Sequence, residues 1–169
     1  GIAKDGYYSI IDFRGEIIRL FQKYGWIFHG EVTIFKSPEL AAIRTKNHQL
    51  MHGTTKKDSS IVRPGLADYL IIMRKPGENK NKINNNGNGI PFEKWCKIAS
   101  PVWLDINESD TLQGWRNGRD NNDERHITPT QLEVIENYLH MYSNPNDIVF
   151  TPFMGIGSEV YQAIKMNRK

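Results

Sequence analysis

The sequence has little cysteine, no long apolar run and only a small excess of charge. Its single cysteine in 169 residues, Cys96, excludes an internal disulfide and a zinc site built from several thiolates. We see neither a secretory signal nor an apolar stretch of membrane-spanning length, so we expect a cytoplasmic protein with no membrane partner. The formal net charge of +3 permits a polyanionic partner without requiring one.

Two widespread nucleotide-binding patterns are also missing. Val160 occupies the position of the third glycine in the dinucleotide pattern G-x-G-x-x-G, and no glycine-rich loop ends in Gly-Lys-Ser or Gly-Lys-Thr. Neither NAD nor ATP is therefore the expected ligand. His29 and Glu31 share one face of an expected strand, but no third metal ligand is evident, and we expect no metal site.

What the sequence does contain is a dense series of signals between residues 124 and 166. Thr128 can cap a helix in which Pro129 takes the first position and Gln131 follows three residues after the cap. Apolar residues then recur at helical spacing and predict one buried helix face: Leu132, Ile135, Leu139 and Tyr142. The turn-forming sequence Asn144–Asp147 ends this helix.

A short apolar run follows the turn and leads into two glycines. Ile148–Phe150 predicts a buried strand, because its residues are β-branched or aromatic. Gly155 and Gly157 come next, and helical spacing resumes at Ser158. Glycines at such a junction permit a positive φ or a close backbone approach, and the start of the following helix attracts anionic groups. This order is typical of the nucleotide-binding corner of a doubly wound α/β sheet, although a ligand-free strand-to-helix turn would show the same pattern.

Three motifs in this stretch resemble one family. Pro152–Ser158 (PFMGIGS) resembles the P-F-x-G-x-G motif of S-adenosylmethionine-dependent DNA amino-methyltransferases. Pro129–Gln131 resembles the P-T-Q core that precedes this motif in members of the permuted, beta-type order, and Asn144–Val149 resembles the N-P-G-D-x-V sequence between them. The order and spacing agree. The resemblance extends from about Ile11 to the end of the chain and is closest to phage-type methylases of the N4-cytosine/N6-adenine group.

The resemblance implies an α/β fold, a Rossmann-like methyltransferase sheet with helices on both faces. It implies S-adenosylmethionine as the cofactor and double-stranded DNA as the partner, in a restriction-modification context. It also implies a set of cofactor-binding residues: Thr128, Pro129, Thr130, Gln131, Thr151, Phe153, Gly155 and Gly157. Thr151 stands where the family usually has an acidic residue, which changes one expected polar contact.

The family's amine-gripping motif, two prolines followed by an aromatic residue, does not occur in this sequence. In permuted members it lies before the helix that we expect at residues 9–24, so here it would precede Gly1; the strand that binds the cofactor ribose would follow Lys169. Both ends therefore look cut. We expect a fragment of one methyltransferase domain over residues 1–169, with residues 124–169 as its cofactor-binding segment. We expect no catalytic residue in it, no activity from it alone, and unpaired sheet edges that invite homodimerisation.

The rest of the chain predicts further elements and two surface segments. β-Branched and aromatic residues predict a central strand at residues 31–35, and a near-continuous apolar run predicts a buried strand at residues 68–74. Residues 44–63 are rich in basic side chains, and four of them are candidate contacts to DNA phosphates: Arg44, Lys46, Lys56 and Lys57. A solvated polar linker explains that segment equally well. The Asn-rich residues 77–90 predict a flexible surface loop.

Three functional hypotheses follow. The first is a DNA methyltransferase that transfers a methyl group from S-adenosylmethionine to an exocyclic amino group of adenine or cytosine. The second is a catalytically inactive remnant of that fold that binds DNA or protein, and the absent amine-gripping motif favours it. The third is an unrelated nucleotide-binding α/β domain.

Overall fold

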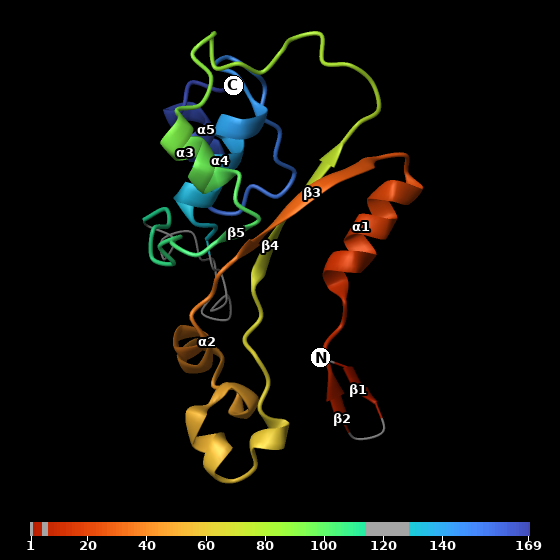
Figure 1. The fold of residues 1–169 in the computed structure, drawn as a ribbon, viewed down its shortest axis with the longest axis vertical. Helices are drawn as coiled ribbons and strands as arrows, with labels where there is room; N and C mark the ends of the chain where they lie inside the picture. Colours follow the sequence, from red (N-terminus) through yellow and green to blue (C-terminus); the bar gives the residue numbers. More distant parts are fainter. Residues whose placement is uncertain (1, 5–6, 114–128) are drawn as a thin grey trace. The chain divides into compact units, whose positions relative to one another are not determined.

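The computed structural model describes residues 2–4, 7–113 and 129–169 (Figure 1). The chain divides into two compact units, residues 1–80 and residues 81–169. Each unit is described by itself below. Within the described ranges, no helix is long and apolar enough to cross a membrane. The prediction of one methyltransferase domain over residues 1–169 stays a prediction.

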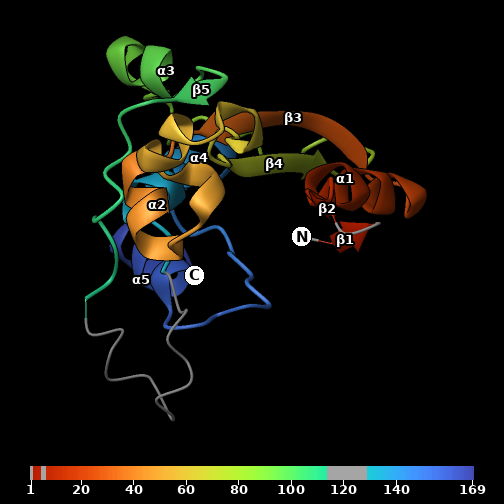
Figure 2. The same ribbon diagram turned by 90° about the horizontal axis from the view of Figure 1, so that it is seen from below.

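The first unit combines two antiparallel strand pairs with two helices and three 3₁₀ turns (Figures 1 and 2). Its strands are β1 (Ile2–Lys4), β2 (Tyr7–Ser9), β3 (Ile27–Ile34) and β4 (Asp68–Arg74). Its helices and turns are α1 (Phe13–Lys23), α2 (Pro38–Thr45), η1 (His48–Leu50), η2 (His52–Lys56) and η3 (Ser59–Ile61).

The β3–β4 pair forms the scaffold of the first unit. Its antiparallel register runs from Ile27 opposite Arg74 to Ile34 opposite Asp68, with an irregularity between Phe28 and Gly30. The predicted strands at residues 31–35 and 68–74 are thus confirmed in position. The expected burial of the second is wrong, because no residue of β4 is fully buried.

Helix α1 packs on this strand pair through one basic side chain. Arg14 donates to Glu31 of β3 at 2.7 Å, and its guanidinium lies 4.9 Å from the centre of the Tyr69 ring of β4. The helix predicted at residues 9–24 is confirmed, but it begins later than Ser9, because Asp12 is the N-cap and accepts from the backbone N–H of Gly15.

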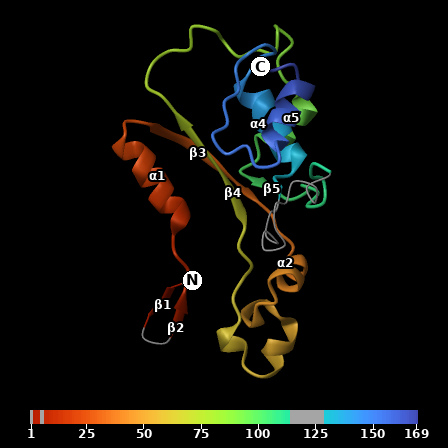
Figure 3. The same cartoon turned by 180° about the vertical axis from the view of Figure 1, so that it is seen from behind.

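The second unit is built around two packed helices (Figure 3). Its elements are α3 (Phe92–Ile98), β5 (Val102–Trp103), α4 (Leu132–Tyr142) and α5 (Ser158–Lys165). Ile135 and Leu139 of α4 meet Ala163 of α5 in a core cluster of buried residues. Trp103 is also buried and donates its indole N–H to the carbonyl of Ile98, which fits the role of a packing anchor.

The Asn-rich segment of the second unit is attached to the end of α4. The Asn144 side-chain oxygen accepts from the backbone N–H groups of Asn84 and Asn85, both at 3.0 Å, and its amide donates to the carbonyl of Lys82 at 2.9 Å. Asn85 also donates to the carbonyl of His140 at 3.4 Å. The flexibility expected for residues 77–90 stays a prediction, but four hydrogen bonds anchor residues 82–85.

The fold class agrees with expectation in its broad terms. The chain is mixed α/β, as predicted. The strand pairs of the first unit are antiparallel, and the expected Rossmann-like sheet with helices on both faces stays a prediction. A parallel pair needs a crossover between its strands, whereas β3 and β4 run in opposite directions on either side of the segment 35–67.

Candidate functional site

The glycine loop adopts the backbone conformation that its sequence predicts. Gly155 has φ 52° and Gly157 has φ 89°, both in the left-handed region that favours glycine. Gly157 is the N-cap of α5: its carbonyl accepts from Tyr161, and its N–H donates to the carbonyl of Met154 at 2.7 Å. A Cβ at either glycine would meet nothing within 4 Å. The glycines are therefore required for backbone geometry, and the space beside them is open.

The first turn of α5 has an unused polar atom. Ser158 is 3% exposed, and its hydroxyl oxygen has no hydrogen-bond partner among the described residues. The Oε1 atom of Gln162, one turn further on, is likewise buried without a partner within the described part of the chain. Buried polar atoms normally find a partner, so each of these atoms can accept a bond from another molecule or from water.

The predicted Pro129–Gln131 motif lies near this turn. Thr130 donates from its hydroxyl to Glu159 of α5 at 3.5 Å. The structure therefore brings the two motif segments together, although they are separated by α4 in the sequence. The roles of Pro129, Thr130 and Gln131 in cofactor binding stay predictions. Thr128 lies outside the described residues.

The described residues do not test where the amine-gripping motif lies. We expect it before Gly1, and Gly1 itself lies outside the described residues. The absence of a catalytic residue from this chain rests on that expectation, so it stays a prediction as well.

The predicted start of α4 is wrong by three residues. The helix begins at Leu132, and its N-cap is Gln131, which is 4% exposed, has an extended backbone and makes no side-chain cap. Gln131 forms a β-bridge with Thr111, and the N–H of Leu132 donates to the carbonyl of Asp110 at 2.9 Å. These bonds to a distant segment hold the backbone extended where local capping rules predict a first helical turn.

The predicted buried strand at Ile148–Phe150 is also wrong. Ile148 is 84% exposed and Phe150 is 83% exposed, while Val149 alone packs against the core cluster. One side of this segment is paired: Val149 donates to the carbonyl of Lys169 at 2.7 Å, and Lys169 donates back to Asp147 at 2.8 Å. The alternating exposure shows an extended segment with one covered face, and the described residues do not place it within a parallel sheet.

The two other predicted cofactor contacts lie on the exposed part of the loop. Phe153 is 88% exposed, and Thr151 is half-buried. An aromatic ring left in solvent beside left-handed glycines is available to the flat face of a bound ligand. The roles of both residues stay predictions.

A charged cluster that the sequence did not reveal supports α4 from both sides. Glu136 accepts from Lys94 of α3 at 2.7 Å and from Gln162 of α5 at 3.3 Å. The hydrogen bond from Lys94 is the main reason that the pKa of Glu136 lies below its usual value. Burial, reinforced by Lys94, lowers the pKa of His140, which stands 3.6 Å from Glu136. The i, i+4 spacing of Glu136 and His140 allows their contact to be predicted from the sequence. The contact with Lys94 could not be predicted, because Lys94 lies about 40 residues away in the sequence.

The four predicted DNA contacts fall in one part of the first unit. Arg44 and Lys46 lie at the end of α2, Lys56 ends η2, and Lys57 follows it; all four are exposed. Their role stays a prediction. No group of three or more metal-ligating side chains gathers within residues 2–4, 7–113 and 129–169.

Comparison with known proteins identifies relatives of this chain. The profile of the family described as DNA methylase matches residues 4–169. The type II methyltransferase M.BglII of Bacillus subtilis is 41% identical over 105 residues, which cover 59% of this chain and 26% of that relative.

Solved structures agree on the fold. TTHA0409 of Thermus thermophilus, named as a DNA modification methylase and crystallised with S-adenosyl-L-methionine, matches 97% of this chain with a TM-score of 0.67 and 18% identity. A second crystal structure of TTHA0409 matches 94% of this chain with a TM-score of 0.63 and 19% identity. These matches cover 54% and 52% of TTHA0409, so the chain spans about half the length of that protein.

The match over residues 4–169 takes in the glycine loop, the P-T-Q segment and both strands of the scaffold. The chain belongs to the N6/N4 DNA methylase family.

Proposed function

We propose that this chain is the cofactor-side portion of a site-specific DNA methyltransferase. The enzyme would transfer a methyl group from S-adenosylmethionine to an exocyclic amino group of adenine or cytosine in double-stranded DNA. The observation that carries the proposal is the left-handed conformation of both loop glycines directly before α5, in a member of the DNA methylase family. TTHA0409, which shares the fold, was crystallised with this cofactor.

The residues present fit such a cofactor. The buried Ser158 hydroxyl lacks a partner in the described part of the chain, and the free N–H groups at the start of α5 carry a partial positive charge. Gly155 and Gly157 leave room for close backbone approach, and Phe153 presents an open ring face. When bound, S-adenosylmethionine supplies an electrophilic methyl group on a sulfonium. The protein's task is to hold that methyl in line with the acceptor amine.

The second hypothesis, an inactive remnant that binds DNA or protein, has one observation in its favour. The sequence contains no pair of prolines followed by an aromatic residue, the motif expected to grip the acceptor amine. The complete open reading frame that encodes this chain decides between the two. The expected homodimer also stays a prediction, and gel filtration with light scattering tests it.

The first experiment measures cofactor binding by isothermal titration of S-adenosylmethionine into the protein made from the complete reading frame. Gly157→Asp should lower the affinity at least about 100-fold, because a side chain is strained at φ 89° and would enter the open space beside the loop. Phe153→Ala should lower it about 10-fold without changing stability, since the ring is exposed. Gly53→Ala is the control, because Gly53 lies in the other unit and has open space around it. Unchanged affinity in both loop variants would reject the cofactor site.

The second experiment measures transfer of tritium from labelled S-adenosylmethionine to DNA by the protein made from the complete reading frame. Nucleoside analysis of the product then distinguishes N6-methyladenine from N4-methylcytosine. Absence of transfer, with cofactor binding intact, would favour the inactive remnant.

A further inference from the structure

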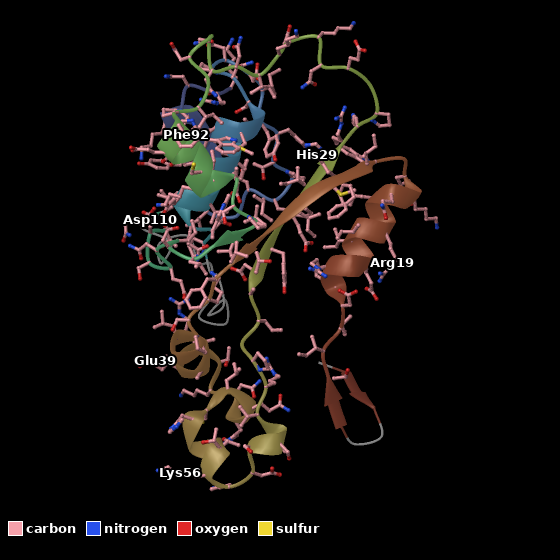
Figure 4. All side chains as sticks on the ribbon, viewed as in Figure 1. Arg19, His29, Glu39, Lys56, Phe92 and Asp110 are labelled. Atoms are coloured by element: carbon pink, nitrogen blue, oxygen red, sulfur yellow. The ribbon has the colours of Figure 1, made fainter. Side chains whose placement is uncertain are left out.

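We propose that residues 38–63 form a pocket that receives one unstacked base of DNA while neighbouring lysines contact the flanking phosphates. The inference rests on the DNA substrate of the proposed function and adds a recognition site that none of the predicted cofactor residues lines. The segment follows β3 and consists of α2 and the three 3₁₀ turns; Figure 4 labels Glu39 on α2 and Lys56 on η2.

The segment lines an open pocket of about 650 Å³ within the first unit. Its wall is mainly aliphatic, from Ile43 of α2 and from Leu50, Met51 and Val62 of the turns. Ile43 is 64% exposed, so part of the apolar lining faces solvent. A volume of several hundred cubic ångströms is typical of sites that hold a small planar group.

The pocket is preformed despite its lack of long helices. Arg63 donates twice to Gln49, from its backbone N–H to the carbonyl and from its side chain to the side-chain oxygen, each at 3.1 Å. Thr54 donates to the carbonyl of His48 at 2.7 Å. Ser60 donates from both its N–H and its hydroxyl to Asp58, and the hydroxyl bond chiefly lowers the pKa of that carboxyl. A site held in this way needs little further ordering when a ligand enters.

The charge of the segment suits a polyanionic occupant. Residues 38–63 contain five lysines and arginines against two acidic residues, a net charge of +3. The whole chain also has a net charge of +3, so the remaining residues balance to zero. Lys46 lines the pocket itself, where the left-handed C-cap of α2 fixes its backbone at φ 51°. Lys56 and Lys57 lie exposed on η2 and just after it, where their ammonium groups are free to contact phosphates.

An apolar pocket with a basic rim suits an unstacked base better than a paired one. Bases in a duplex present only their edges in the grooves, and a recessed pocket cannot reach them; a base outside the stack exposes two apolar faces. Its polar edge requires hydrogen-bond partners, and Glu39 and His52 in the lining supply an acceptor and a donor. Removal of the acceptor base from a duplex for methylation leaves its former partner base unpaired, which provides such an occupant.

The test compares two DNA duplexes by fluorescence anisotropy with this chain, in the absence of S-adenosylmethionine. One duplex is fully paired, and the other carries a single unpaired 2-aminopurine. The bulged duplex should bind about 10-fold more tightly, and the 2-aminopurine fluorescence should change on binding. Ala42→Phe, which fills the pocket from α2, should remove that preference without altering affinity for the paired duplex. Ala99→Phe at an exposed position of the second unit is the matched control, and circular dichroism checks the fold of both variants.

Substitution of the lysines should change DNA affinity in a different way from filling the pocket. Lys56→Gln combined with Lys57→Gln should weaken binding of both duplexes equally and reduce the slope of log affinity against log salt by about 2. Equal binding of the two duplexes, no binding of either, or a bulge preference that survives Ala42→Phe would overturn the inference. Because the assay omits the cofactor, failure of methyl transfer with an intact bulge preference would reject the proposed function and leave this inference standing.

Discussion

Helices α1 and α4 have the same length and similar apolar periodicity, yet they differ in what they bury. Each has 11 residues. Helix α4 buries Val134, Ile135, Asn137 and Leu139, whereas α1 buries no residue, and its Phe13 and its C-cap Tyr24 are 68% and 74% exposed. A pattern of apolar residues therefore predicts a helix, but it does not predict whether a partner covers the apolar face.

The comparison separates two ways of holding a helix. Helix α4 is held by a core cluster, by Glu136 on its side and by Arg168 at its end. Helix α1 is held by its Asp12 cap and by the contact of Arg14 with β3. Substitutions in α4 should therefore lower the stability of the fold strongly, and equivalent substitutions in α1 should lower it only slightly.

The largest expected difference in the free energy of unfolding is between the variants Ile135→Ala in α4 and Leu20→Ala in α1. Ile135 is 0% exposed, so truncation leaves a cavity against Leu139 and Ala163 and should lower the free energy of unfolding of the second unit by about 3 kcal/mol. Leu20 is 52% exposed, and the same truncation should cost about 0.5 kcal/mol or less. Hydrogen exchange read separately in each unit measures both values. Equal losses would show that α1 is buried in solution.

Arg168→Met should cause the next largest loss of stability. Arg168 is 7% exposed and donates to the carbonyls of Leu139 and Ser143 at 3.2 and 2.8 Å, and to the Ser143 hydroxyl at 3.0 Å. It thus satisfies carbonyl groups at the end of α4 and places a cation at the negative end of the helix dipole. Its loss should cost about 2 kcal/mol, measured by urea unfolding. Lys169→Met is the control, and an equal effect there would refute the role of the guanidinium.

Acidification should weaken the support of α4 through His140. Burial holds the folded-state pKa of this group below its usual value of 6.5, so the unfolded chain takes up the proton first. Stability of the second unit should therefore fall as pH decreases through 6.5 toward the folded-state value, whereas Glu136, with its lowered pKa, titrates only at more acidic pH. His140→Gln should flatten the stability profile between about pH 7.5 and 5.5. An unchanged profile would assign the pH dependence to another group.

Gly15→Ala in α1 should have the smallest effect. Alanine favours a helix interior by about 1 kcal/mol over glycine. A Cβ at this position, however, would collide with the Asp12 carboxylate that caps the helix, and loss of that cap costs about 1 kcal/mol. The two effects should cancel to within about 0.5 kcal/mol in thermal unfolding. The double variant with Asp12→Ala should then be no less stable than Asp12→Ala alone.

The sequence predicted those features that are determined by residues close together in the chain. The left-handed φ values of Gly155 and Gly157 agree with the reading of a glycine turn into the helix at Ser158, although the strand expected before that turn is absent from the described residues 148–150. The strands near Val32 and Ile71 were found from their β-branched and apolar content. The turn at Asn144 was read from its composition, and its N–H indeed donates to Asp147.

Features that depend on contacts between residues far apart in the sequence could not be predicted in this way. The start of α4 is displaced because Gln131 bridges to Thr111, and no capping rule includes a residue so far away. The hydrogen bonds from Asn84 and Asn85 to Asn144 join residues about 60 positions apart, where composition alone suggests only a loop. That the Ser158 hydroxyl lacks a partner among the described residues emerges only when its neighbours have been placed.

The left-handed backbone at position 157 makes the loop sensitive to chirality. A D-alanine introduced there by peptide ligation would favour φ 89°, whereas an L-alanine would resist it, although both add a single methyl group. The two variants therefore distinguish two reasons for the glycine. If cofactor binding requires only the left-handed backbone, the D-alanine variant keeps its affinity. If binding requires the absence of any side chain, the D-alanine variant loses it.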